Sequence, residues 1–222
     1  MNRIAIGLIL LILFGFATYL SGQYAVANTY LQNASNIVSL SPRNEAPSET
    51  AMTIARAQIN EALSILPNDP DNLDLAGRIL YLAALNSSSE AQGTALLQES
   101  KRLHIKALEA RQYWPYSYVN LVYTKSALGE IDTDYENHFK SAYMLGLDDR
   151  DVIRDLLYAG INDWNQVTPE LQELTVTLAI EVLQEKIVSP RGLRPYLESE
   201  AQLFRLCAQM EQFEEKVALC NS

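Results

Sequence analysis

The sequence predicts an all-α protein in which one hydrophobic helix precedes a domain of antiparallel helix pairs. Seventeen consecutive residues near the N-terminus carry no charge. Glycine and proline number only 9 and 8 among 222 residues, and the apolar residues are mostly Leu, Ala and Ile, a composition that favours helix over sheet. Beyond the first segment, apolar residues recur three and four positions apart between short polar turns. We therefore expect helices throughout the chain.

The uncharged segment has the composition of a transmembrane helix. It runs from Ile4 to Leu20 and follows Arg3. A rise of about 1.5 Å per residue puts this length at the lower limit for crossing a hydrocarbon core of roughly 30 Å. Ser21, Gly22 and Tyr24 can extend the helix into the interface. Residues 1–22 are therefore predicted to form a signal anchor that contacts the membrane through residues 4–20.

The positive charges predict the orientation of this anchor. Arg43 is the next positive residue after Arg3. Because positive residues stay on the cytoplasmic side, we expect a single-pass inner-membrane protein with a cytoplasmic N-terminus and a periplasmic C-terminal domain. The alternative is a cleaved signal peptide, since Ala25-Val26-Ala27 forms an A-x-A pattern before Asn28. The apolar run is long for a signal peptide, which favours the anchor, and both interpretations export the domain.

The net charge excludes one class of partner. The formal charge is −10 and the isoelectric point is about 4.7. Nucleic-acid binders need clustered Lys and Arg to neutralise phosphates, so we expect no nucleic-acid binding. An acidic surface also repels anionic lipid headgroups, which leaves the N-terminal segment as the predicted membrane contact.

Residues 23–47 are predicted to be a helical stalk and a linker. The helical part has apolar residues at alternating spacings of three and four, and Ser41–Pro47 (SPRNEAP) then carries two prolines without periodicity. Residues 48–222 follow as the helical domain. The apolar stripe of the stalk comprises Tyr24, Ala27, Leu31, Ala34 and Val38.

Start and stop signals divide the domain into helices. Ser48, Asp69, Asp132 and Thr168 stand where N-cap residues are expected, and Gly129 and Gly146 stand where helices end. Proline occupies the first helical position after Asp69, Trp114 and Thr168. The predicted helices are 49–66, 70–85, 90–110, 115–128, 133–145, 149–162 and 168–186, with one or two more after Pro190.

A degraded internal repeat refines the fold class. The pattern A-x-x-x-I-x-x-A-L-x-x-x-P from Ala55 to Pro67 has the spacing of the second helix of a tetratricopeptide repeat (TPR). Continuing the count of 34 residues places Gly77 where that repeat uses a glycine for close helix approach. In a second repeat, which begins at Pro115, Val122 occupies the position of this glycine. We therefore expect a TPR-like antiparallel helix-pair superhelix, with an irregular helical array as the alternative.

Few residues suggest catalysis. The two histidines, His104 and His138, lie on predicted helices, where a packed or half-buried side chain is the favoured interpretation and a ligand role the alternative. The sequence has no C-x-x-C, H-E-x-x-H, G-x-S-x-G or phosphate-binding glycine loop. We expect no catalytic residue, no metal site and no cofactor, and predict that the chain is not an enzyme.

An aromatic cluster is the most distinctive local feature. Its rings could stack on sugars or anchor a partner peptide. The favoured interpretation is structural, with Trp114 and Tyr118 filling the junction between helix pairs and Trp164 acting in the same way. The candidate ligand- or partner-binding residues are Tyr113, Trp114, Tyr116, Tyr118 and Tyr123.

Two cysteines, Cys207 and Cys220, lie near the C-terminus. In an exported domain an even number of cysteines suggests a disulfide, which here would close a short loop. Two free buried thiols are the alternative.

The whole arrangement resembles the VpsP-type family of bacterial polysaccharide-biosynthesis proteins. The resemblance covers most of the chain and is carried by the Arg-then-hydrophobic anchor, the Ala55–Pro67 pattern, the block YWPYSYVN from Tyr113 to Asn120 with Leu128-Gly129, and Arg205-Leu206-Cys207. It implies a role in producing or exporting an exopolysaccharide of a biofilm matrix, and it carries over no catalytic residues.

The leading functional hypothesis is therefore a membrane-tethered scaffold that binds protein partners in a membrane polysaccharide-assembly complex. A direct carbohydrate-binding module is the second hypothesis, and a scaffold for another envelope assembly process is the third. Solvent-exposed rings of the aromatic cluster in one groove would favour carbohydrate binding, whereas rings buried between helices would count against it.

Overall fold

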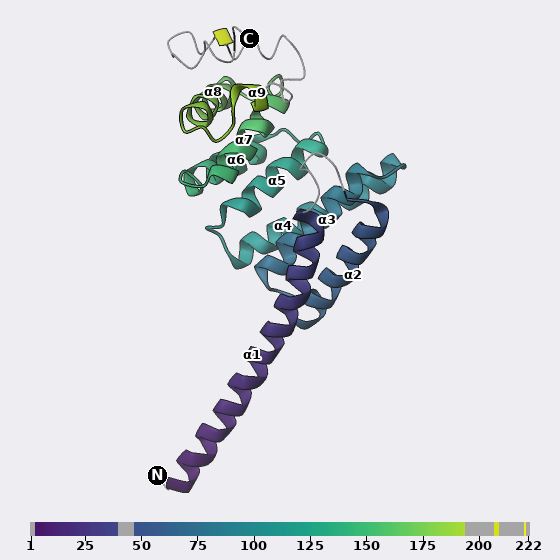
Figure 1. The fold of residues 1–222 in the computed structure, drawn as a ribbon, viewed down its shortest axis with the longest axis vertical. Helices are drawn as coiled ribbons and strands as arrows, with labels where there is room; N and C mark the ends of the chain where they lie inside the picture. The colour runs from purple at the N-terminus through teal and green to yellow at the C-terminus, as the bar shows by residue number, and fades with distance from the viewer. Residues whose placement is uncertain (1–2, 40–46, 194–206, 209–219, 221–222) are drawn as a thin grey trace. The chain divides into compact units, whose positions relative to one another are not determined.

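The computed structural model describes residues 3–39, 47–193, 207–208 and 220. Within these residues all regular secondary structure is α-helical, as predicted (Figure 1). The helices are α1 (Arg3–Ser39), α2 (Glu49–Ile65), α3 (Pro70–Leu85), α4 (Glu90–Ala110), α5 (Pro115–Ala127), α6 (Thr133–Leu145), α7 (Arg150–Asn162), α8 (Pro169–Gln184) and α9 (Pro190–Leu193).

Helix α1 is continuous over 37 residues, or about 55 Å. Its N-terminal half protrudes from the helices packed around its C-terminal half (Figure 1). The helix is long and apolar enough to cross a membrane, and its most apolar stretch is not buried. This confirms one N-terminal apolar helix of the kind found in signal anchors and signal sequences.

The C-terminal half of α1 belongs to a packed core. Ala27, Ala34 and Val38 are buried, and Ala34 and Val38 join a cluster with residues of the following helices. The helical part of the predicted stalk therefore packs directly on α2 as one member of a helix pair. Residues 40–46, which hold most of the predicted linker, lie outside the described residues.

The chain forms two compact units, divided between Arg111 and Gln112, inside the segment predicted as one domain. In the first unit, α1 pairs with α2 and α3 pairs with α4, while α3 also contacts α1 and α2. The second unit repeats this pattern with α5–α6 and α7–α8, and α7 contacts both α5 and α6. Each unit is therefore built from two packed helix pairs.

Small residues lie at the helix contacts of both units. Ala62 on α2 and Ala107 on α4 are fully buried in the core of the first unit, and Ala142 on α6 is fully buried in the second. Their small side chains let neighbouring helices approach closely. Trp164, after α7, is buried in the core of the second unit, in agreement with its predicted packing role.

Local capping signals explain where most helices begin. Ser48, Asp69 and Asp132 accept hydrogen bonds from backbone N–H groups of the first turn, as predicted. Thr168 precedes α8 but makes no capping bond, and its hydroxyl instead donates to Glu136 on α6 at 3.0 Å. A partner in another helix has displaced the local cap. After α9, only residues 207, 208 and 220 are described, so the further closing helix falls outside them.

Candidate partner-binding surface

The aromatic cluster lies at the beginning of α5. Pro115 occupies the first helical position, where its missing N–H costs nothing because that group would have no helical partner. Trp114 stands at the N-cap and makes no side-chain capping bond. The segment Tyr113–Tyr118 therefore spans the chain entry and the first turn of the helix.

Three of the five candidate rings are held in place by hydrogen bonds. The hydroxyl of Tyr116 donates to Asp149 Oδ2 at 2.7 Å, and that of Tyr123 donates to the carbonyl of Asp155 at 2.9 Å. Tyr118 donates to the carbonyl of Gln112 at 3.1 Å. All three tyrosines pack partly buried against the core of the second unit. Tyr116 and Tyr123 thereby connect α5 to the start and the middle of α7, whereas Tyr118 bonds the segment that precedes its own helix.

The other two rings are exposed. Tyr113 keeps 80% of its surface accessible and Trp114 keeps 36%, and neither belongs to the core of the second unit. The indole of Trp114 lies 5.5 Å from the ring of Tyr116, measured between centroids. Trp114 therefore keeps part of its surface accessible while its ring lies close to that of Tyr116.

Apolar side chains from α6 lie at the same end of the second unit. Since α5 and α6 form an antiparallel pair joined by a short turn, the start of α5 meets the end of α6. The bond from Tyr116 to Asp149 ties the start of α5 to the start of α7. Met144, at 70%, is among the most exposed apolar residues there. We call this surface the end patch and define it as Tyr113, Trp114, Met144, Leu145 and Leu147.

The end patch concentrates exposed apolar surface. Among the described residues outside α1, eight large hydrophobic side chains are exposed, and five of them belong to the patch. Exposed apolar residues gathered at one end of a unit are typical of interaction sites, and aromatic residues and Met are enriched at protein interfaces. Sequence reasoning missed the contribution of α6, although the nearly unbroken apolar run Tyr143–Leu147 at a helix end is the signal that could have revealed it.

His104 is fully buried in the first unit. Its Nδ1 lies 2.6 Å from Asp74 Oδ1 on α3, and its buried Nε2 has no hydrogen-bond partner. A Cβ placed on Gly77 would lie 2.7 Å from this Nε2, so the nitrogen faces helix backbone and leaves no room for a substrate atom. The pair resembles half of a catalytic triad, but its geometry serves helix packing.

His138 is half-buried on α6, with its ring centroid 5.9 Å from that of Tyr118. Burial lowers the pKa of His138 below the ordinary value, and the positive charge of Lys125 acts in the same direction. Both histidines therefore occupy the packed helix positions expected from the sequence.

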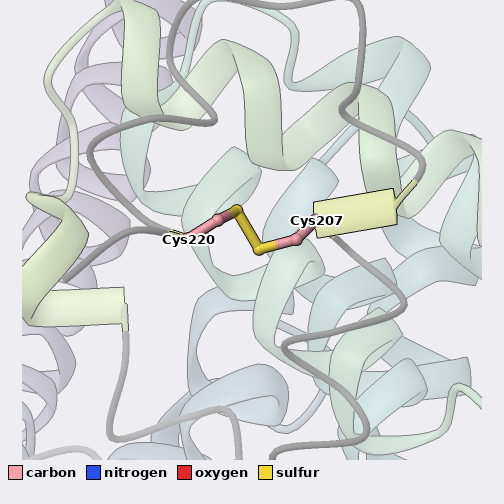
Figure 2. Close-up of a disulfide and its surroundings, with 2 residues drawn as sticks. All are labelled: Cys207 and Cys220. Carbon is pink, nitrogen blue, oxygen red and sulfur yellow. A yellow bond between two sulfur atoms is a disulfide. The ribbon is translucent and has the colours of Figure 1, made fainter.

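Cys207 and Cys220 are joined by a disulfide, with their Cα atoms 5.9 Å apart (Figure 2). Cys207 is buried, and Cys220 packs partly buried against the core of the second unit. In the part of the chain that the structure describes, no three His, Cys, Asp or Glu side chains converge into a metal-binding group.

Comparison with protein-family models, with curated proteins and with solved structures gives no match for this chain.

Proposed function

We propose that this protein is a membrane-anchored, TPR-like scaffold that binds a protein partner through the end patch. Within each unit every helix packs on the next one, and the first helix of one pair contacts the first helix of the following pair. This is the packing pattern of TPR arrays, and Gly77 makes the close approach that the repeat spacing assigns to it. The pairing therefore supports a repeat scaffold.

The observation that carries the proposal is the composition of the end patch. It combines two exposed aromatic rings with three exposed aliphatic side chains at one end of the second unit, and these can bury apolar area against a partner. Sugar binding needs flat rings and polar groups that pair with hydroxyls, whereas Met144, Leu145 and Leu147 supply neither. Protein binding is therefore the better fit, and carbohydrate stacking on Tyr113 and Trp114 is the second candidate.

The anchor and the disulfide support the proposed location. Helix α1 is apolar and exposed along its N-terminal half, as a membrane span requires. The disulfide fits an oxidising compartment such as the periplasm. We propose that α1 crosses the inner membrane with its N-terminus in the cytoplasm, since Arg3 precedes the apolar run.

The process served by the scaffold is proposed from the sequence resemblance alone. The resemblance to the VpsP-type family, carried by Ala55–Pro67 and Tyr113–Asn120, supports a role in exopolysaccharide production or export. A scaffold in another envelope assembly process would use the same anchor and end patch. The experiment must therefore test the role in exopolysaccharide production separately from the role of the end patch.

The test measures cell-associated exopolysaccharide in a deletion strain complemented with variants of the full chain. One variant carries Tyr113→Ser, Met144→Ser and Leu147→Ser, and its matched control carries Ile54→Ser, Leu85→Ser and Ile105→Ser, which removes three equally apolar exposed side chains outside the patch. Immunoblotting verifies that both variants accumulate to the level of the wild type.

We expect the deletion to lower polymer, the wild type and the control to restore it, and the patch variant to fail. Unchanged polymer in the deletion strain would overturn the polysaccharide assignment. Full restoration by the patch variant would overturn the role of the patch. Binding of purified polymer that is lost on Trp114→Ala would favour the carbohydrate alternative.

A further inference from the structure

We propose that one edge of the first unit lies on the lipid headgroups. This membrane-proximal edge consists of the α2–α3 turn, Leu66–Asp69, and the C-terminal end of α4, Lys106–Arg111. The inference rests on the proposed membrane anchoring and adds to it the face of the domain that meets the bilayer. It follows from the continuity of α1 and from the register of the helices packed on it.

Helix α1 passes without interruption from exposed apolar surface into the packed core. Tyr19 and Tyr24 are exposed, whereas Ala27, one turn later, is buried. The hydroxyl of Thr18 donates to the carbonyls of Phe14 and Gly15, so this polar group is satisfied within the helix, as a lipid environment requires. Tyrosine concentrates at membrane interfaces, which places the exit from the bilayer near Tyr24.

The register between α1 and α2 brings the α2–α3 turn to this level. Asn33 Nδ2 donates to Gln58 Oε1 at 3.2 Å, which aligns the two antiparallel helices. Counting nine residues, about 13 Å, back along α1 reaches Tyr24, and counting nine residues forward along α2 reaches Pro67. The α2–α3 turn therefore lies beside the point where α1 leaves the bilayer.

The register between α3 and α4 adds the end of α4 to the same edge. Ser100 Oγ donates to the carbonyl of Gly77 at 2.7 Å, halfway along the pair. Arg111 pairs with Asp71 at 2.7 Å, and Lys106 Nζ donates to the carbonyl of Pro67 at 3.5 Å. The opposite edge holds the α3–α4 turn, separated from this one by the 16 residues of α3, or about 24 Å.

The chemistry of the edge suits the headgroup layer. The edge carries two positive residues, Lys106 and Arg111, and two negative ones, Asp69 and Glu109. Arg111 also pairs with the neighbouring Asp71, and Asp69 caps the first turn of α3. Lys106 and Arg111 present N–H donors that can also bond lipid phosphates. The net charge of −10 gives no general attraction to anionic lipid. In this proposal the continuous helix α1, and not salt-dependent attraction to lipid, sets the distance between the first unit and the bilayer.

The experiment measures the depth of two turns in the full-length chain. Asn68→Cys and Ser88→Cys place a fluorophore in the α2–α3 or the α3–α4 turn, at exposed positions of the same unit. Each labelled protein is reconstituted into phosphatidylcholine vesicles that contain lipid with a nitroxide on the headgroup. The native cysteines are joined in a disulfide and stay unlabelled when no reductant is present.

We expect the label at Asn68 to be quenched about threefold or more above the label at Ser88, because contact quenching does not span the ~24 Å between the turns. This difference should persist at high salt. Equal quenching at both positions, or stronger quenching at Ser88, would overturn the proposal.

A second variant tests the role of the helix. Seven alanine-rich residues inserted after Gly22 lengthen α1 by about 10 Å and turn it by nearly two full turns, so the packed face keeps its direction. Quenching at Asn68 should fall toward that at Ser88, while helical content by circular dichroism rises slightly. Unchanged quenching at Asn68 would contradict the proposal that the length of α1 sets the distance between the α2–α3 turn and the bilayer.

The experiments distinguish failure of the proposed membrane anchoring from failure of the proposed partner binding. The mass of the mature chain from cells reports whether residues 1–27 are retained, and their loss would overturn the membrane-proximal edge. Loss of the anchor alone would leave the end patch and its polymer phenotype intact.

Discussion

His104 on α4 packs directly against the backbone of Gly77 on α3. A Cβ added to Gly77 would lie 2.6 Å from His104 Cε1, closer than carbon atoms approach without a shift. The same imidazole bonds Asp74 through Nδ1, one turn before Gly77. The imidazole is therefore bonded to Asp74 through Nδ1 and packed against the Gly77 backbone through Cε1 and Nε2.

Gly77→Ala should lower the free energy of unfolding by about 1–3 kcal/mol, since it overpacks a well-filled contact. The matched control is Gly93→Ala on α4, where the nearest atom is the carbonyl oxygen of Ala84 at 3.4 Å, an ordinary contact. That change should be neutral or stabilising by up to about 1 kcal/mol, because Ala favours helix. Urea denaturation of the detergent-solubilised chain measures both. Equal unfolding free energies of Gly77→Ala and Gly93→Ala would contradict the close approach of His104 to the backbone of Gly77.

Asp132→Ala should cost about 1–3 kcal/mol, because the carboxylate has two roles. It caps α6 by accepting the N–H of Tyr135 at 2.9 Å, and it accepts a hydrogen bond from buried Lys125 at 3.0 Å. The capping bond from Tyr135 is the main reason that the pKa of Asp132 lies below its ordinary value. Asp132→Asn should cost less, since Asn also caps helices, and Asp134→Ala in the same turn should cost little. The ranking is checked by thermal unfolding, and an Asp134 variant as unstable as the Asp132 variant would refute it.

His138 should make the second unit less stable in mild acid. Burial lowers its pKa in the folded state, so the unfolded chain takes up a proton more readily. Stability should therefore fall as the pH drops from above the ordinary value of 6.5 through the lowered pKa, and then level off. This acid-induced loss of stability should occur in the wild type and be absent in His138→Gln. The difference between the two unfolding free energies is followed from pH 8 to 5, and parallel profiles would exclude the effect.

The sequence predicted the helix starts well because capping is local. Ser48, Asp69 and Asp132 cap the helices that follow them, and each bond joins atoms two or three residues apart. Thr168 shows the limit of such reasoning. It precedes α8 as predicted, yet its hydroxyl bonds Glu136, a residue 32 positions away that no local pattern identifies.

Contacts between helices were predicted only where a repeat supplied the register. Gly77 was recognised from the TPR spacing, whereas the partner of His104 was not, because Asp74 lies 30 residues away in the sequence. Gly160 on α7 makes a similar close approach to Thr175 on α8 and was missed, since no repeat count reaches it. Its presence inside an apolar helix pattern is the only signal.

The candidate site was predicted in part for the same reason. Tyr113 was identified because aromatic density is visible in one segment of the sequence. Met144 and Leu147 join it only through the antiparallel pairing of α5 and α6, and the exposure of Trp114 depends on what packs around it. Burial is a property of tertiary packing, so spacing along one helix could not decide which rings face solvent.

Reduction of the disulfide between Cys207 and Cys220 should loosen the C-terminal end of the second unit. The bridge joins residues 13 positions apart, and the loss of a loop of this size is expected to cost about 3 kcal/mol by chain entropy. Both cysteines are at least partly buried, and Cys220 contacts the core of the unit, so the constraint acts on packed structure. Cys207→Ser with Cys220→Ser should lower the unfolding temperature, and reductant should lower it equally in the wild type while leaving the double variant unchanged. A wild type that reductant does not destabilise, or that reacts with a thiol reagent when denatured without reductant, would show that the bridge is not part of the folded protein.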